Sequence, residues 1–160
     1  MLKTISATFG SKKVLETVIK RHPERQFKLL QSNSTQQQLQ LLDLSDKPTI
    51  FQSSVEYRVL GHCGSNEFRG LSNFEFFKLE LDDQKMLRSA VNNSLLNNPP
   101  KNLIAAYLLE NKFESNELII LTMWPTLKDF NDWKHGPDYK FLESFNSSQD
   151  RYYQRTYQPA

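Results

Sequence analysis

Hydrophobic positions in the C-terminal part of the chain change between the spacing of strands and that of helices. Apolar residues alternate in four segments, and in the segments between them they recur on one helical face. The predicted order is strand, helix, strand, strand, helix, strand, over residues 68–81, 82–96, 102–110, 117–124, the helical stretches on either side of Gly136 and Pro137, and 151–157. This order is the split β-α-β arrangement of a ferredoxin-like α+β domain.

The N-terminal part has a shorter pattern of the same kind. Residues 2–9 alternate as in a strand, and Ser11 is placed to cap a helix that ends before Pro23. Three further extended stretches follow, over residues 27–31, 38–43 and 55–59. We therefore predict two regions, an N-terminal α+β region over residues 1–65 and a ferredoxin-fold domain over residues 66–160.

The helix after residue 124 has a recognisable start. Thr126 and Asp129 form the [ST]-x-x-[DE] capping pattern, in which the hydroxyl accepts from a free backbone N–H group of the first turn. The apolar stripe that follows consists of Leu127, Phe130 and Trp133. Trp133 lies at the edge of this stripe, where an indole either packs in the core or lines a cavity beside it.

The two central strands are apolar on both faces. Both alternations of residues 118–123 and of residues 103–108 consist almost entirely of apolar side chains. An antiparallel sheet with helices on one face normally exposes the other face to water. The second face is therefore expected to be covered, either by a second subunit or by the N-terminal residues of the same chain acting as a pseudo-dimer partner.

Composition and charge exclude several classes of protein. The 160 residues carry 20 basic and 18 acidic side chains without a Lys/Arg stripe, so nucleic acid is not an expected partner. Cys63 is the one cysteine, which rules out an intrachain disulfide, and no Cys/His group has zinc-ligand spacing. We therefore expect no metal site. Because no run of about eighteen apolar residues occurs, we also expect a cytoplasmic protein without a membrane span.

The run LIILTMWPTLKDFNDW over residues 118–133 resembles the strand-to-helix signature of heme-degrading monooxygenases in the antibiotic-biosynthesis monooxygenase (ABM) superfamily. Phe9-Gly10, residues 57–64 and residues 151–159 are similar to a subgroup with an N-terminal extension, which includes bacillary heme-degrading monooxygenases and the staphylococcal signal transduction protein TRAP. The resemblance covers nearly the whole chain and implies a dimeric α+β barrel type of fold.

The same resemblance implies a site. In the heme-degrading relatives, the site consists of an Asn on the first strand, a Trp on the second helix and an axial His ten residues after that Trp. Asn73 and Trp133 match the first two, so that the Asn73 amide would face bound oxygen and Trp133 the porphyrin. The third position holds Glu143, a poor ligand for ferrous heme iron, which leaves Tyr139 and His135 as substitute ligands.

The periodicity of apolar residues predicts which way each of these side chains points. Asn73 alternates with Leu71 and Phe77, which we interpret as the face toward the barrel interior. With α-helical spacing, Tyr139 and Glu143 lie roughly 100° from the apolar stripe of their segment, so both are expected on a solvated face. Without the resemblance, Trp133 would be read as a core residue.

Two classes of function follow from the resemblance. The first is an oxygen-dependent monooxygenase that acts on heme or, without a cofactor, on an oxidisable small aromatic molecule. The second is a non-enzymatic regulatory or small-molecule-binding protein of the TRAP type, which loss of the axial His favours. The expected assembly is either a monomeric pseudo-dimer or a homodimer.

Overall fold

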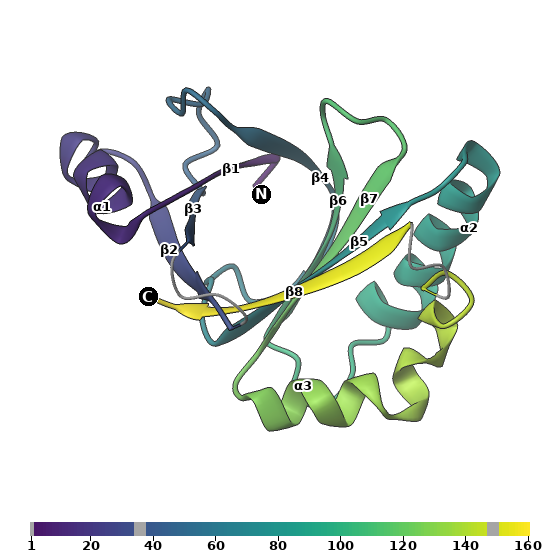
Figure 1. Cartoon of the computed structure of the whole chain (residues 1–160). Coiled ribbons are helices and arrows are strands. Elements are labelled where there is room, and N and C mark those ends of the chain that lie inside the picture. The colour runs from purple at the N-terminus through teal and green to yellow at the C-terminus, as the bar shows by residue number, and fades with distance from the viewer. Residues whose placement is uncertain (1, 34–37, 147–150) are drawn as a thin grey trace.

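The computed structural model describes residues 2–33, 38–146 and 151–160. Within them, strands from both parts of the chain form one closed antiparallel barrel, which Figure 1 shows nearly along its axis. The strands are β1 (Thr4–Gly10), β2 (Phe27–Ser32), β3 (Leu39–Asp43), β4 (Val55–Gly64), β5 (Leu71–Lys78), β6 (Ala105–Asn111), β7 (Glu117–Trp124) and β8 (Tyr152–Pro159). Their order around the barrel is β1-β3-β2-β8-β5-β7-β6-β4, and β4 pairs again with β1.

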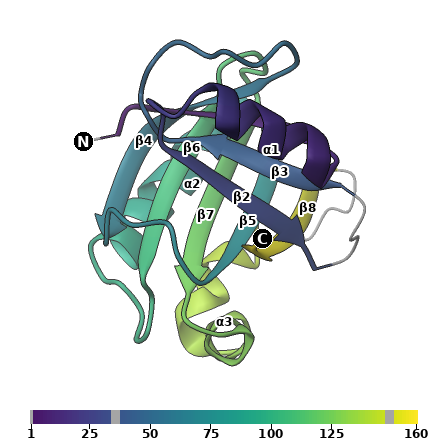
Figure 2. The ribbon, with the colours of Figure 1, turned by 90° about the vertical axis from the view of Figure 1, so that its left-hand side faces the viewer.

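The helices lie outside the barrel on two sides. In chain order they are α1 (Lys12–Arg21), α2 (Leu81–Val91) with a π-helical continuation η1 (Asn92–Leu96), α3 (Leu127–Lys134) and the 3₁₀ helix η2 (Pro137–Leu142). Figure 2 shows α1 over β2 and β3, where Leu15 packs on Leu39 and Leu41. The other helices cover β5, β6 and β7 on the opposite side (Figure 1). No helix in the described part of the chain is long and apolar enough to cross a membrane.

The C-terminal part confirms the predicted α+β order. It runs β5-α2-β6-β7-α3-β8, which is the β-α-β-β-α-β sequence of a ferredoxin-like fold. The capping prediction is also confirmed, because the backbone N–H of Asp129 donates to the Thr126 hydroxyl at 3.2 Å. Ser11 caps α1 in the same way, by accepting from Val14. The predicted division at residues 65 and 66 falls in the loop between β4 and β5, and the separation into two domains stays a prediction.

Both faces of the C-terminal sheet are buried, and the N-terminal strands cover one of them. The barrel interior combines buried side chains of the N-terminal strands with side chains of the C-terminal ones, among them Ile5, Leu30, Leu42, Tyr57, Phe74, Phe76, Tyr107 and Leu121. The opposite alternation of β5, β6 and β7 packs against α2, η1, α3 and η2. The prediction that the N-terminal half acts as a pseudo-dimer partner within the chain is thus confirmed.

Gly70 precedes β5 at a place where a side chain does not fit. Its φ of +73° is in the left-handed region, and an added Cβ would lie 2.3 Å from the Trp124 carbonyl oxygen. We expect Gly70→Ala to lower the free energy of unfolding by about 2 kcal/mol, as measured by urea denaturation. Gly10→Ala is the matched control, because its Cβ would meet only the Leu15 side chain at 3.6 Å. Equal effects of the two substitutions would contradict this prediction.

Candidate functional site

Asn73 lies on the helix-covered face of β5. It shares this face with Leu71 and Phe77, which pack with α2, α3 and η2, whereas Phe74 and Phe76 point into the barrel. The prediction that Asn73 faces the barrel interior is therefore wrong. The alternation with Leu71 and Phe77 is present, but both faces of β5 are buried, so the pattern does not show which of them is inside.

A buried carboxylate, Glu75, lies beside Asn73 on the same face. Both side chains are fully buried, and the Asn73 amide nitrogen donates to Glu75 Oε2 at 3.2 Å. The other oxygen, Oε1, pairs with the Lys134 ammonium at 3.1 Å and accepts from the hydroxyls of Tyr139 and Tyr152, each at 2.6 Å. A buried carboxylate needs such partners because it has lost its hydration.

Lys134, at the end of α3, joins the helices to the sheet around this carboxylate. Its ammonium group donates to the hydroxyls of Tyr139 and Tyr152 at 2.9 Å each and to Gln154 Oε1 at 2.7 Å. It also lies 4.4 Å from the centre of the Tyr139 ring, which adds a cation–π contact. The network therefore fixes α3, η2 and β8 to one point of β5.

The two tyrosines of this network keep their hydroxyl protons at pH values well above the ordinary tyrosine pKa. Burial and the charge of Glu75 raise the pKa of both Tyr139 and Tyr152. Tyr139 is only 2% exposed and receives a further hydrogen bond from Asn146 at 2.8 Å. The expectation that Tyr139 lies on a solvated face is therefore wrong, whereas Glu143 is exposed as expected.

Trp133 belongs to the same layer as Asn73. Its ring packs 5.1 Å from the Trp124 ring and 4.9 Å, edge to face, from the Tyr139 ring, as centroid distances. Trp124 in turn donates to Thr122, the residue opposite Asn73 in the ladder between β5 and β7. Asn73 and Trp133 are thus linked on one side through Trp124 and Thr122 and on the other through Tyr139 and Glu75.

The cavity beside Trp133 does not extend to Asn73. The cavity that borders Trp133 has a volume of about 340 Å³ and is lined by α3, by residues 100–102 and by residues 136–138, but not by Asn73. Within the described residues, two buried polar atoms of the layer have no hydrogen-bond partner, Asn73 Oδ1 and Trp133 Nε1. The assignment of Asn73 and Trp133 as catalytic residues stays a prediction.

The residues proposed as iron ligands do not fit heme. Tyr139 faces the layer, but its hydroxyl donates to Glu75, and its raised pKa opposes the phenolate form that binds iron. The ring nitrogen Nδ1 of His135, an exposed residue, lies 2.9 Å from the carbonyl oxygen of Asn131 at the end of α3. Glu143 is exposed at the end of η2. None of the three combines a free donor atom with a place facing Asn73.

Comparisons with known proteins identify structures and sequences that are similar to this chain. A crystal structure of a ferredoxin-fold protein from Listeria monocytogenes, related to antibiotic biosynthesis monooxygenases, superposes with a TM-score of 0.78 at 24% identity, over 99% of this chain and 95% of that one. The chain shares the ferredoxin-type fold of this ABM-related protein. A heme-degrading monooxygenase of Listeria monocytogenes serovar 1/2a is 25% identical over 136 residues, which are 85% of this chain and 80% of the relative.

A regulator has the same ABM-type fold. The structure of a major regulator of staphylococcal pathogenesis gives a TM-score of 0.83 at 14% identity, over 99% of both chains. No protein-family model matches the chain. Resemblance to the ABM superfamily, with both heme-degrading and regulatory relatives, is therefore established, and the local chemistry of this chain has to decide between the two classes.

Sequence reasoning missed Glu75 and Lys134 as members of this layer. Glu75 had a signal, because a charged residue between Phe74 and Phe76 in the middle of a predicted strand has to find a partner if the strand is buried. The sequence contains no comparable signal for Lys134, since a lysine near the end of a helix is common on any protein surface.

We expect Glu75→Gln to lower the free energy of unfolding by about 3 kcal/mol, because it leaves the ammonium group of Lys134 without its counter-charge in a largely buried place. Glu110→Gln is the matched control: Glu110 pairs with Arg58 and Arg88 at a more exposed site, so a loss below about 1 kcal/mol is expected. Urea denaturation at pH 7 measures both losses, and equal losses would refute the structural role given to Glu75.

We also expect stability to fall as the pH rises above about 10, the ordinary tyrosine pKa. The folded state keeps the protons of Tyr139 and Tyr152 in that range while the unfolded chain releases them, so the stabilisation present below pH 10 is lost with rising pH. Tyr152→Phe should be less stable at pH 8 and show a shallower decline up to pH 11. A urea midpoint that stays constant from pH 8 to pH 11 would contradict this assignment.

Proposed function

We propose that this chain is an ABM monooxygenase-like protein that acts without heme iron, as a regulatory or small-molecule-binding protein. The observation that carries the proposal is the hydrogen bonding of the Tyr139 hydroxyl within the protein. Of the three candidate iron ligands it alone faces the layer of Asn73 and Trp133, and its hydroxyl is held by Glu75 at 2.6 Å.

The chemistry of iron ligation supports this proposal. A proximal ligand of heme needs a lone pair directed at the iron, as in a neutral imidazole or a phenolate. Freeing the Tyr139 hydroxyl would break its contacts with Glu75, Lys134 and Asn146, and would leave the Glu75–Lys134 pair short of a partner. The structural cost of heme ligation here is therefore far larger than at an open histidine. The fold shared with the staphylococcal regulator agrees with this class of function.

A second candidate is a monooxygenase, and two observations favour it. The sequence is 25% identical to a heme-degrading monooxygenase over most of its length. Asn73 Oδ1 and Trp133 Nε1 are also buried without a partner in the described residues, which is unusual for structural groups. Such an enzyme would act on heme, or without a cofactor on an aromatic molecule that itself reacts with oxygen.

We further infer that the protein works in the cytoplasm as a monomeric pseudo-dimer. The single cysteine fits a reducing compartment. One chain supplies all strands of the closed barrel, so barrel closure needs no second subunit. A mass of two chains by light scattering at micromolar concentration would instead show the homodimer.

Hemin titration tests the proposed function. We expect the wild-type protein to give no saturable Soret shift with equimolar hemin, and no loss of the band when ascorbate is added in air. A shift followed by bleaching would overturn the proposal in favour of a heme-degrading enzyme. A shift without bleaching would leave a heme-binding protein.

Two histidine variants sharpen the test. Glu143→His places an imidazole at the position of the axial ligand, and Glu114→His adds one on the loop between β6 and β7 as a control for surface binding. Because Glu143 is exposed, we expect the two variants to bind hemin equally weakly. Tight binding by Glu143→His alone would show that a heme pocket remains, and would favour the monooxygenase.

A further inference from the structure

One end of the barrel opens into a cavity that is separate from the layer of Asn73 and Trp133. It has a volume of about 360 Å³. Its lining comes from the start of the chain, from the residues that flank β2 and β3, from the loop between β4 and β5, and from β6. Tyr107 and Phe68 belong to the interior core of the barrel, so the cavity lies on the other side of the sheet from α3 and η2.

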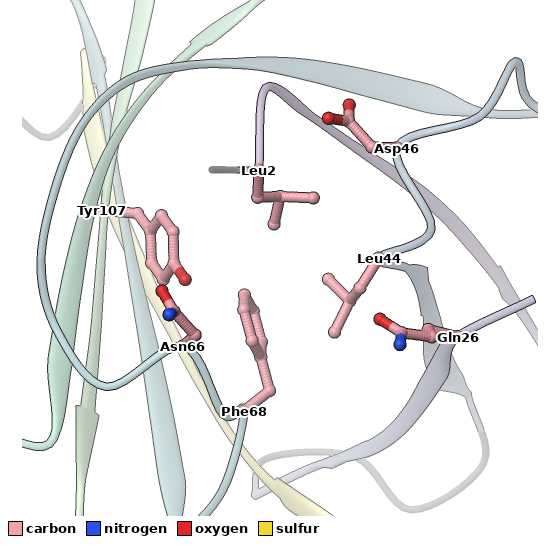
Figure 3. A pocket seen from close by; sticks show the side chains of 7 residues that line it. All are labelled: Leu2, Gln26, Leu44, Asp46, Asn66, Phe68 and Tyr107. Carbon is pink, nitrogen blue, oxygen red and sulfur yellow. The ribbon is translucent and has the colours of Figure 1, made fainter.

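The cavity has an apolar floor and a polar rim. Figure 3 shows the side chains of Leu2, Leu44, Phe68 and Tyr107 turned toward one central space. The amide groups of Gln26 and Asn66 approach the same space from the side, and both residues are otherwise exposed. A concave apolar surface with a few polar groups at its edge is typical of small-molecule sites, and the mouth of a β-barrel is a common place for one.

Tyr107 is held rigidly on this floor. The His62 ring stacks on it with a centroid distance of 4.3 Å, and Phe68 packs 5.3 Å from it on another side. His62 is fixed in turn, since its Nε2 lies 2.9 Å from the carbonyl oxygen of Ser65. A side chain held in this way loses little conformational entropy when a ligand binds beside it.

The hydroxyl of Tyr107 is available to a ligand. Tyr107 is 2% exposed, and within the described residues its hydroxyl makes no hydrogen bond. It lies at the cavity edge that faces Asn66 in Figure 3. A hydroxyl on a cavity lining that makes no hydrogen bond within the protein can donate to, or accept from, a polar group of a ligand.

The charges around the cavity favour a neutral ligand. Asp46 is the acidic group of the rim, and its two carboxylate oxygens accept from the backbone N–H groups of Lys3 and Thr4, at 3.1 Å each. Among the residues that the structure describes, no basic side chain lines this cavity. The adjoining hollow contains Arg69, which is paired with Glu67 at 3.6 Å. Amide groups such as those of Gln26 and Asn66 both donate and accept, which suits hydroxyl or amide substituents.

We propose that this end of the barrel binds a neutral planar aromatic molecule of one or two rings that carries a hydroxyl or amide group. Phe68 contacts the face of the ligand ring, Leu2 and Leu44 contact its edge, and the Tyr107 hydroxyl with the amides of Gln26 and Asn66 binds its polar substituent. The site does not depend on the proposed function, because it uses the interior face of the sheet and none of the residues around Glu75.

The test uses 2-naphthol as the probe with the full chain, followed by amide chemical shifts in ¹H–¹⁵N spectra. We expect saturable binding below 1 mM, with the largest shifts at Leu44, Phe68 and Tyr107. The anion 2-naphthoate should bind more weakly. Absence of saturation, shifts centred on α3 and η2, or tighter binding of 2-naphthoate would each overturn the proposal.

Three variants locate the site. Asn66→Trp places a large ring in the mouth from an exposed position and should abolish binding, while Asn116→Trp, on the exposed loop before β7 at the other end of the barrel, should bind like the wild type. Tyr107→Phe should weaken binding about fivefold, the effect of one lost hydrogen bond, with little change in the urea midpoint. Wild-type affinity in Asn66→Trp, or equal loss in both tryptophan variants, would refute the site.

Discussion

Closure of the barrel is the constraint on which the rest of this structure depends. The sheet closes where β2 pairs with β8 through three residue pairs, Leu30 with Pro159 to Ser32 with Tyr157, and where β4 pairs with β6 on the other side. Without these ladders the N-terminal strands would leave the interior faces of β5, β6 and β7 in water, and each half would have unpaired edges. Closure therefore requires mainly apolar side chains on the interior faces of those strands.

Closure also explains why a charged residue at the sheet centre needs so many partners. Once the interior face is used by the barrel, the other face is buried under α2, α3 and η2, and Glu75 lies between the two layers. Lys134 and the two tyrosines compensate its lost hydration, and they belong to the same layer as Asn73 and Trp133. The same network that stabilises the layer thus holds the Tyr139 hydroxyl, which would have to be released before it could bind another group.

The sequence allowed much of the fold to be predicted, for physical reasons that differ between elements. The start of α3 was predictable because a capping box is a local interaction between Thr126 and Asp129. The covered sheet was predictable because two apolar alternations in one strand cannot both face water. The direction of Asn73 was not, because a pattern with a period of two distinguishes the faces of a strand but not which of two buried faces is the inner one.

The candidate site shows a second limit of periodicity. Tyr139 was placed on a solvated face by assuming about 100° per residue, but η2 is a 3₁₀ helix with three residues per turn. In that geometry Tyr139 and Leu142 lie on the same face, and both are buried. The barrel-mouth cavity was also beyond the sequence, since Leu2, Leu44 and Tyr107 meet only after strands far apart along the chain have paired.

Formation of the barrel from one chain affects how such a protein can evolve. In a barrel made of two identical subunits every substitution occurs twice, so the two sheets must remain alike. Here the two sheets are encoded separately: one side holds α1 over β2 and β3, and the other holds the layer around Glu75. Selection can therefore alter each side independently of the other. Assembly of the barrel is an intramolecular step that does not weaken on dilution.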